Sequence, residues 1–309
     1  MKRALLIAGG GTLGTYVAEE LLGLGHSVDV ICLEDKESSN PNLRYFKASA
    51  TLEYLRELLS KNRYDGIVNF LHYTKCDDYA PYHELLSQST EHLIFLSSYR
   101  VYADVRHPIT ENAPQLIDVI KDDPEFHKND TYGLAKSRCE RFLADNPYPK
   151  NWTVVRPVIS FSERRFDIIL TSDHDVIDAA RSGRAIKLPL EAKDLVAGLD
   201  WAGNSGKLIA NLLFKKECIG EAYTISTAQG LTWSEVADIY TELLGVDYET
   251  IYAMTGKTAS LDATVLREAT PEQADAVLEL IAELTAIDNC LKCSILVAVS
   301  GNGNRTFHL

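Results

Sequence analysis

Ala4-Leu5-Leu6-Ile7-Ala8-Gly9-Gly10-Gly11-Thr12-Leu13-Gly14 is the stretch that decides the fold of this chain. Its apolar residues, Ala4 to Ala8, predict a short buried strand, and Thr12 to Leu24 predicts a helix directly after the glycines. The glycines satisfy the pattern G-x-G-x-x-G, which permits a tight turn and close approach of the backbone to a pyrophosphate. The N-terminus of the helix offers N–H groups and the positive end of its dipole to phosphates. We therefore expect a dinucleotide to contact Gly9, Gly11, Thr12, Leu13 and Gly14.

An acidic residue about 20 positions after such a turn usually binds the adenosine ribose. Glu34 and Asp35 are near enough, just beyond a strand predicted from Val28 to Leu33 whose natural end is Cys32. We assign Glu34 to the cofactor site. Lys36 could instead meet a 2′-phosphate, so the sequence leaves both NAD and NADP open as the cofactor.

Short apolar runs alternate with amphipathic stretches through the first 160 residues. Further strands are predicted at Gly66 to Leu71, Leu93 to Leu96 and Trp152 to Val155, and further helices at Leu52 to Ser60, Tyr82 to Ser89 and Thr131 to Leu143. Strands that alternate with helices indicate a parallel sheet covered on both faces. The predicted fold class is therefore α/β, a Rossmann-type doubly wound parallel sheet.

Beyond Pro157 the pattern becomes irregular, which indicates a smaller C-terminal region. Helices are predicted at Asp173 to Ser182, Ser205 to Phe214 and Trp233 to Leu244 with Thr232 as N-cap, and a strand at Ala222 to Ser226. We expect a dinucleotide-binding domain at 1–160, a substrate-binding region at 161–254 whose chain returns to the sheet, and a divergent tail at 255–309. In the tail, Thr270-Pro-Glu-Gln273 is a capping box that opens a helix to about Leu284, and a terminal hairpin could follow.

Tyr132-Gly-Leu-Ala-Lys136 places a phenol and an ammonium four residues apart. On a helix this spacing puts both side chains on one face. Because a nearby ammonium favours the phenolate, the pair could serve as a general base. The spacing alone is weak evidence, since about one such pair is expected by chance in a chain of this length.

Composition excludes several classes of protein. Formal net charge is −13 and the pI is near 5.1, which disfavours nucleic acid or an anionic membrane as the main partner. The apolar run after Met1 is too short for an export signal, and no segment approaches the roughly 20 apolar residues of a membrane span. Cys290 and Cys293 form a single C-x-x-C pair, so we expect no metal site and free thiols in a reducing cytoplasm.

Four segments together resemble the extended, nucleotide-sugar-epimerase-like branch of the short-chain dehydrogenase/reductase superfamily. They are Ser97-Ser98-Tyr99-Arg100-Val101-Tyr102, Tyr132-Gly-Leu-Ala-Lys136 with Glu140, Val154-Val155-Arg156-Pro157, and Ile219-Gly-Glu-Ala-Tyr-Thr-Ile225. They resemble the S-S-x-x-V-Y, Y-G-x-x-K-x-x-x-E, R-P and G-x-x-Y-x-I motifs of that branch, in consistent order over roughly residues 3 to 245. The chain departs from the branch at Ala8, where a glycine is usual, in the short segment from His72 to Leu93, and at Ala202-Gly203-Asn204, where the branch has V-D-D.

The resemblance implies roles for particular residues. Tyr132 would exchange a proton with a substrate hydroxyl or carbonyl, Lys136 would support the phenolate and bind the nicotinamide ribose, and Ser98 would hydrogen-bond the reacting oxygen. The alternative for Ser98 is a hydroxyl that caps the next turn. Pro157 would contact the cofactor. Tyr99 and Tyr102 are more typical of packing residues.

The resemblance also implies an NAD(P)-dependent epimerase, dehydratase or reductase that acts on a small molecule such as a nucleotide sugar. Five basic residues could line a diphosphate site, although a solvated surface is the simpler interpretation: Arg164, Arg165, His174, Arg181 and Arg184. A homodimer is compatible with the sequence. The alternatives are a regulatory protein that binds a dinucleotide without catalysis, and an RNA-binding protein, which the charge of −13 disfavours.

Overall fold

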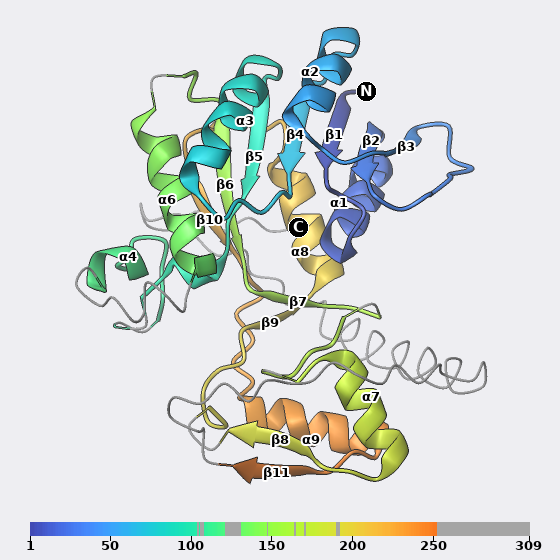
Figure 1. The fold of residues 1–309 in the computed structure, drawn as a ribbon, viewed down its shortest axis with the longest axis vertical. Helices are drawn as coiled ribbons and strands as arrows, with labels where there is room; N and C mark the ends of the chain where they lie inside the picture. Colours follow the sequence, from blue (N-terminus) through green and yellow to red (C-terminus); the bar gives the residue numbers. More distant parts are fainter. Residues whose placement is uncertain are drawn as a thin grey trace. The chain divides into compact units, whose positions relative to one another are not determined.

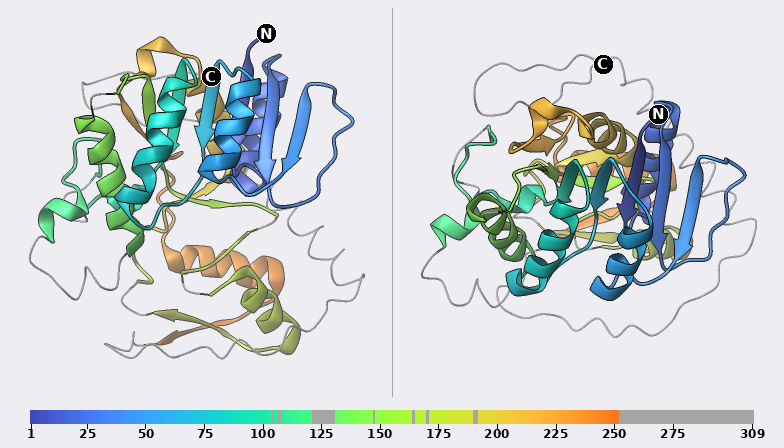
Figure 2. Two further views of the ribbon diagram at one scale, coloured as in Figure 1. Left: turned by 45° about the horizontal axis from the view of Figure 1, so that its top comes forward. Right: turned by 90° about the horizontal axis from the view of Figure 1, so that it is seen from above.

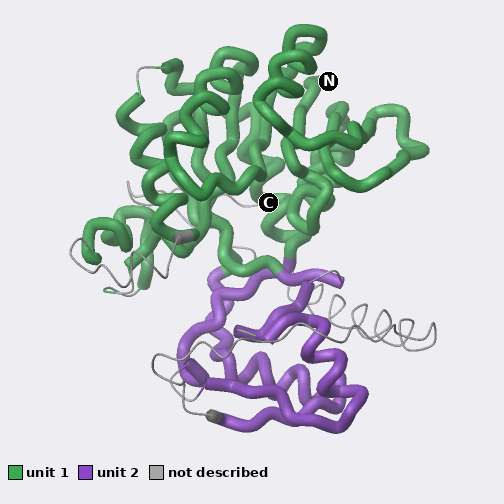
Figure 3. The backbone as a smooth tube through the Cα atoms, viewed as in Figure 1, with its two compact units in different colours: residues 1–160, 202–227, 295–309 green, residues 161–201, 228–294 purple. Residues whose placement is uncertain are grey.

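A computed structural model describes residues 1–103, 105, 108–120, 131–146, 148–163, 165–169, 171–189 and 192–251. Arg164, Cys290, Cys293 and the helix and hairpin predicted beyond residue 255 lie outside the described residues. Figure 3 shows that the chain divides into two compact units. The described part of the first unit consists of residues 1–160 and 202–227, and that of the second lies within 161–201 and 228–251.

A seven-stranded sheet forms the centre of the first unit, in the order β10-β6-β5-β4-β1-β2-β3 (Figure 1). Its strands are β1 (Arg3–Ile7), β2 (Ser27–Cys32), β3 (Leu43–Lys47), β4 (Gly66–Asn69), β5 (His92–Leu96), β6 (Trp152–Pro157) and β10 (Ala222–Ile225). All six neighbouring pairs are parallel. The strand order reverses at β1, which lies between β2 and β4. In doubly wound sheets, ligands bind outside the carboxyl ends of the strands at such a reversal.

Helices cover both faces of this sheet, as the two views of Figure 2 show. They are α1 (Thr12–Gly23), α2 (Leu52–Lys61), α3 (Cys76–Gln88), α6 (Thr131–Asp145) and α8 (Ala202–Leu212), with short turns at η1 (Tyr99–Val101), α4 (Leu116–Val119) and η2 (Lys216–Cys218). Buried side chains of α1 and α8 form one core with one face of the sheet, and those of α2, α3 and α6 form a second core with the other face. The predicted doubly wound α/β fold is confirmed.

Several elements of this unit differ from the prediction. Helix α8 begins at Ala202, three residues before the predicted start at Ser205, and the short helix α4 was not predicted. The edge strand β3 was not predicted, because Leu43–Lys47 has no continuous apolar run. In the structure none of its residues is fully buried, which is why the segment can have a mixed sequence. Helix α3 begins at Cys76, six residues before the predicted start at Tyr82, and it contains Pro81 although a proline inside a helix removes a backbone hydrogen-bond donor. The other predicted helices and strands of residues 1–160 agree with the structure to within two residues at each end.

The second unit contains a small parallel pair of strands and two helices. Its elements are α7 (Asp173–Ser182), β8 (Ile186–Pro189), α9 (Trp233–Leu244) and β11 (Tyr248–Ile251), and β8 pairs with β11. Short strands β7 (Ile159–Phe161) and β9 (Leu199–Trp201) lie where the chain passes between the units. The predicted bounds of α7 and α9 are correct, and Thr232 and Glu235 complete the capping box of α9. Among the described residues, the structure has no helix with the length and hydropathy of a transmembrane span.

Candidate active site

The glycine-rich turn joins β1 to α1 in a conformation that is possible only because glycine has no Cβ atom. A Cβ atom on Gly14 would lie 2.3 Å from the carbonyl oxygen of Gly9, and one on Gly9 would lie 2.7 Å from the Cβ of Leu6. Gly11, by contrast, has open space within 4 Å of its Cβ position and is the N-cap of α1. The first turn of α1 contains no acidic residue. The helix N-terminus therefore offers its positive dipole end to an anion beside Gly11, without a carboxylate in its own first turn to compete for it.

Ala8 occupies the position where the resembling branch has its first glycine. Its φ angle is +56°, which lies in the left-handed region that favours glycine. The backbone of the turn therefore keeps the conformation that a glycine would adopt, although the residue is alanine. This departure from the motif changes the energy of the turn rather than its shape.

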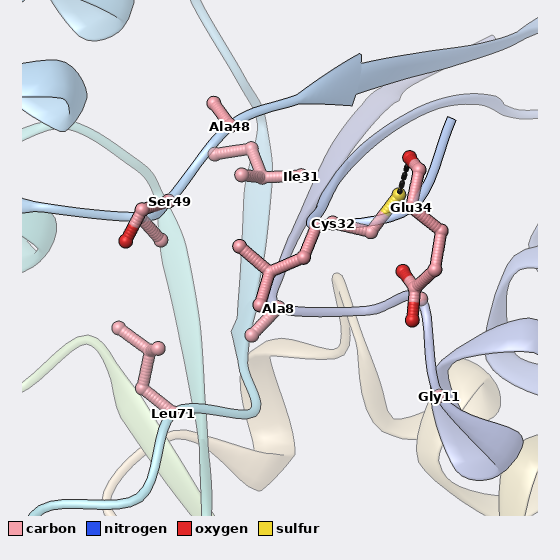
Figure 4. A pocket seen from close by; sticks show the side chains of 11 residues that line it. Ala8, Gly11, Ile31, Cys32, Glu34, Ala48, Ser49 and Leu71 are labelled. Carbon is pink, nitrogen blue, oxygen red and sulfur yellow. Dashed lines mark hydrogen bonds between the residues drawn. The ribbon is translucent and has the colours of Figure 1, made fainter. Parts of the chain in front are cut away.

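A cavity of about 220 Å³ opens beside the turn, at the carboxyl ends of β1 and β2. Figure 4 shows the residues that line it: Ala8, Gly10, Gly11, Ile31, Cys32, Leu33, Glu34, Ala48, Ser49, Ala50 and Leu71. The Glu34 side chain lies along the turn, since its Oε2 atom would be 2.7 Å from a Cβ on Gly10. Most of the lining is apolar, as in a typical binding pocket for a small ligand.

The three charged residues after β2 lie in different places. Only Glu34 lines the cavity. Asp35 pairs with Lys47 at 2.9 Å, where both side chains are exposed. Lys36 donates a hydrogen bond from Nζ to the carbonyl oxygen of Gly10 at 2.6 Å. The Glu34 carboxylate therefore lies on the cavity side of the turn, whereas the Lys36 ammonium is bound to the backbone carbonyl of Gly10.

Lys136 is a buried lysine on α6, with 2% of its surface exposed. Its Nζ donates to the carbonyl oxygen of Leu96 at 2.6 Å and lies 3.5 Å from that of Leu71, so it reaches the segments that leave β5 and β4. Burial lowers the pKa of Lys136 to about 8. Lys136 therefore lies at the edge of the sheet where ligands bind.

Tyr132 is half-buried on the first turn of α6, and its ring is close to Lys136, as the spacing predicts. The Lys136 Nζ lies 5.9 Å from the centroid of the Tyr132 ring. Two further side chains flank the same ring: the His72 ring lies 5.0 Å away, and the guanidinium of Arg100 lies 5.6 Å away. Sequence reasoning missed both as site residues, although each follows the carboxyl end of a sheet strand, where functional residues gather.

Ser98 is buried and is the second residue after the end of β5. Its Oγ accepts a hydrogen bond from the backbone N–H of Arg100 at 3.3 Å, so it caps the short turn η1. The capping alternative for Ser98 is therefore correct. It does not exclude the other role, because a hydroxyl that accepts one hydrogen bond can donate another.

Glu140 and Arg156 form a buried ion pair below the site, between α6 and β6. The Glu140 carboxylate accepts from Arg156 Nε at 3.0 Å, from Gln115 at 3.0 Å and from the Ser97 hydroxyl. Arg156 also donates to the Tyr102 hydroxyl at 2.8 Å. Although burial acts in the opposite direction, the hydrogen bonds to Glu140 raise the pKa of Arg156. These motif residues thus support the elements that carry Ser98 and Lys136.

The remaining predicted residues are placed as follows. Pro157 is buried at the end of β6, beside Ile225 of β10. In the second unit, Arg165 pairs with Asp167 at 2.7 Å, and Arg181 and Arg184 are exposed on and just after α7. Among the described residues, no group of three or more His, Cys, Asp or Glu side chains could hold a metal ion.

Comparison with known proteins relates the chain to others through its fold. No model of a protein family matches the sequence, and no curated protein matches it either. Solved structures do match, and eight of them share 13 to 18% sequence identity with this chain. The chain therefore shares its fold with solved structures of epimerases and a dehydratase, as the predicted resemblance implied.

Three of these structures illustrate the match. The dTDP-glucose 4,6-dehydratase of Bacillus anthracis in complex with NAD has a TM-score of 0.65 and 17% identity, over 82% of this chain and 85% of that one. The UDP-glucose 4-epimerase of Thermus thermophilus in complex with NAD has a TM-score of 0.61 and 18% identity, over 81% and 86%. The Bordetella bronchiseptica enzyme WbmG in complex with NAD and UDP has a TM-score of 0.58 and 18% identity, over 81% of each chain.

Proposed function

We propose that this chain is an NAD-dependent oxidoreductase of the epimerase or dehydratase type, acting on a nucleotide-linked sugar. The observation that carries the proposal is the convergence of a glycine cradle and a Tyr132–Lys136 pair at the carboxyl edge of one parallel sheet. Solved structures with this fold support it, because two are NAD complexes of a sugar dehydratase and a sugar epimerase and a third holds NAD and UDP. A homodimer and a cytoplasmic location stay predictions.

The residues present fit a dinucleotide. The open side of Gly11 and the N-terminus of α1 would receive its pyrophosphate. The Glu34 carboxylate beside the cavity would accept hydrogen bonds from the adenosine ribose. The same carboxylate would repel a 2′-phosphate, and Lys36, the cation that could balance one, donates to Gly10. We therefore propose NAD rather than NADP as the cofactor.

Bound NAD would supply the acceptor for a hydride from the substrate carbon. Side chains of the protein would accept the substrate's hydroxyl proton and stabilise its oxygen. Tyr132 would take the hydroxyl proton, and the Lys136 ammonium would favour the phenolate that receives it. Ser98 would donate its hydroxyl hydrogen to the substrate oxygen as charge develops there. The backbone carbonyl of Leu96 holds the Lys136 Nζ in place for this role.

Calorimetry with NAD and NADP tests the cofactor. We expect NAD to bind and NADP to bind at least tenfold more weakly, since a 2′-phosphate would meet the Glu34 carboxylate. Gly14→Ala should abolish binding, because its methyl group would collide with the backbone of Gly9. Gly23→Ala at the other end of α1 is the matched control, since nothing lies within 4 Å of that Cβ position. Failure of the wild-type chain to bind either dinucleotide would contradict the proposal.

Turnover separates an enzyme from a dinucleotide-binding regulator. We expect the NAD-loaded protein either to interconvert nucleotide sugars or to reduce its cofactor with them. Product chromatography measures the first reaction, and NADH fluorescence measures the second. Tyr132→Phe should lower turnover by about 10²-fold or more while NAD binding persists. Dinucleotide binding without turnover on any sugar tested, unchanged in Tyr132→Phe, would instead favour the regulatory alternative.

A further inference from the structure

Two cysteine side chains meet where α3 packs against α6. Cys76 is the first residue of α3, and Cys139 lies on α6, three residues after Lys136. The Cys139 thiol donates a hydrogen bond to the Cys76 sulfur. The Cys76 Sγ in turn lies 3.7 Å from the backbone carbonyl oxygen of Arg138, the residue before Cys139. The two sulfurs are therefore in direct contact, although they are far apart in the chain.

The two thiols differ in their access to solvent. Cys139 is buried, with 1% of its surface exposed, in the core that α2, α3 and α6 form with the sheet. Cys76 is half-buried at the N-terminus of α3, so a small oxidant can reach its sulfur from solvent. Cys76 is thus the thiol that meets an oxidant first, and Cys139 is the thiol placed to react with it afterwards.

Burial raises the pKa of both thiols, that of Cys139 to about 12. At Cys76 the Asp77 carboxylate adds to this effect, whereas the hydrogen bond from Cys139 and the Arg138 guanidinium favour the thiolate. Since the thiolate is the reacting form of cysteine, the pair reacts slowly near pH 7 and stays as two thiols under reducing conditions. The pair is therefore suited to a response to sustained oxidation rather than to a step in rapid turnover.

We propose that Cys76 and Cys139 are a site of reversible oxidation and form a disulfide when the protein meets a hydroperoxide. The Cys76 thiolate attacks hydrogen peroxide, its sulfur becomes a sulfenic acid, and one water leaves. The Cys139 thiol then attacks that sulfur, so a sulfur–sulfur bond forms and the sulfenic oxygen leaves as a second water. The two thiols lose two electrons and two protons, and the peroxide is reduced to water. A dithiol reverses the step by thiol–disulfide exchange.

The disulfide would tie α6 to the segment between β4 and α3, which lies at the candidate site. In this segment the carbonyl oxygen of Leu71 lies 3.5 Å from the Lys136 Nζ, and the His72 ring lies 5.0 Å from that of Tyr132. Because a covalent link at Cys76 limits local opening of the residues before it, hydrogen exchange of residues 71–75 should slow in the oxidised protein. The modification goes beyond the proposed function, since it occurs whether or not the chain is an enzyme.

Mass spectrometry of the oxidised protein tests the site. The full-length chain carries Cys290→Ser and Cys293→Ser, so that the C-x-x-C pair cannot compete for the oxidant. It is treated with hydrogen peroxide, blocked with iodoacetamide and digested with trypsin without reduction. We expect peptide 76–100 to be joined to peptide 139–141, with the loss of two hydrogen atoms, and dithiothreitol to separate them.

Substitution of single cysteines provides the matched controls. Cys76→Ser, at the half-buried position, should keep the fold and give no linked peptide. Cys32→Ser removes a thiol that contacts Glu34 instead, and should leave the link between the two peptides unchanged. Oxidation should also raise the midpoint of thermal unfolding by about 5 °C, because the link closes a long loop in the unfolded chain. The Cys76→Ser protein should show no such rise.

The outcomes that overturn the inference are distinct from a failure of the proposed function. A pair that stays reduced in excess peroxide, or Cys76 oxidised to the sulfinic acid without a linked peptide, would overturn it. So would a link of either cysteine to Cys32 or Cys218, or an oxidised protein that unfolds at the same temperature as the reduced one. Unchanged hydrogen exchange of residues 71–75 would overturn the coupling to the candidate site. None of these measurements uses NAD or a sugar, so none bears on the proposed reaction.

Discussion

Lys136 shows how a single residue of the candidate site lowers the stability of the fold. Its ammonium is buried, and burial lowers its pKa to about 8, against about 10.4 in an unfolded chain. Below pH 8 both states are protonated, so the folded state bears the full cost of the buried charge. Between pH 8 and 10.4 the folded state releases its proton first, so stability rises with pH in this window.

We therefore expect Lys136→Met to stabilise the protein by roughly 1–3 kcal/mol at pH 7. The upper value is the pKa difference converted to free energy, and the lower value allows for the lost hydrogen bond to Leu96. Urea unfolding at pH 7 and pH 10 measures the effect. The advantage of the variant should shrink at pH 10, because the wild-type lysine is then largely neutral when folded. A variant that is less stable than the wild type at both pH values would contradict this account.

Ala8 is strained, since its φ of +56° is unfavourable for any residue with a side chain. Ala8→Gly should therefore stabilise the fold by about 1 kcal/mol, because relief of strain exceeds the added entropy of the unfolded chain. The same change at Ala4, which lies buried in the extended strand β1, should destabilise instead and is the control. Thermal unfolding of the two variants measures both effects. Lower stability of Ala8→Gly would show that the alanine methyl group has a packing role.

Residues of the site differed in how far the sequence could predict them. The positions of Glu34 and the glycines beside one cavity follow from a motif that fixes their spacing along the chain, and their contact with a cofactor stays a prediction. The capping contact of Ser98 was foreseen only as an alternative, since its choice depends on the local turn. His72 and Arg100 could not be placed, because their approach to Tyr132 depends on how three separate segments meet at one edge of the sheet.

At the scale of elements, periodic segments were predictable and edge segments were not. Buried strands such as β1 have continuous apolar runs, and α9 has a capping box and a glycine at its end. The edge strand β3 packs only partly, so its sequence is mixed. Strands β8 and β11 are distant in the chain and short, and their pairing depends on tertiary contacts that no local pattern records.

The Glu140–Arg156 pair joins α6 to β6, and both side chains are buried, with 5% and 7% exposed. Arg156→Met should cost roughly 3–5 kcal/mol, because it leaves a buried carboxylate without its counter-ion. Adding Glu140→Leu to that variant should recover more than half of the loss, since no charge then remains buried. Urea unfolding of the single and double variants measures both steps.

The control for this cycle is the exposed pair of Arg141 on α6 with Asp118 on α4, whose side chains are 44% and 47% exposed. Arg141→Met should cost less than about 1 kcal/mol, because water screens the pair. A similar loss from the buried and the exposed arginine would mean that Arg156 acts through packing rather than through its charge.

At the scale of the whole molecule, charge decides between the enzyme and the RNA-binding alternative. Each phosphate that a protein neutralises releases a counterion, so RNA affinity falls steeply with salt in proportion to the number of cationic contacts. The chain carries a formal net charge of −13, which repels a polyanion at long range. A protein that neutralises only one or two phosphates releases equally few counterions, too few for stable binding of a polyanion.

We therefore expect no saturable binding of a fluorescein-labelled single-stranded RNA, measured by anisotropy at about 50 mM salt, where electrostatic binding is favoured. Binding that does occur through Arg100 should disappear in Arg100→Gln and fall only about tenfold for a tenfold rise in salt. A logarithmic slope of four or more would require a basic surface elsewhere on the chain and would revive the RNA alternative. Addition of NAD then decides whether such a surface overlaps the cavity beside Glu34, because only an overlapping site would lose the RNA signal.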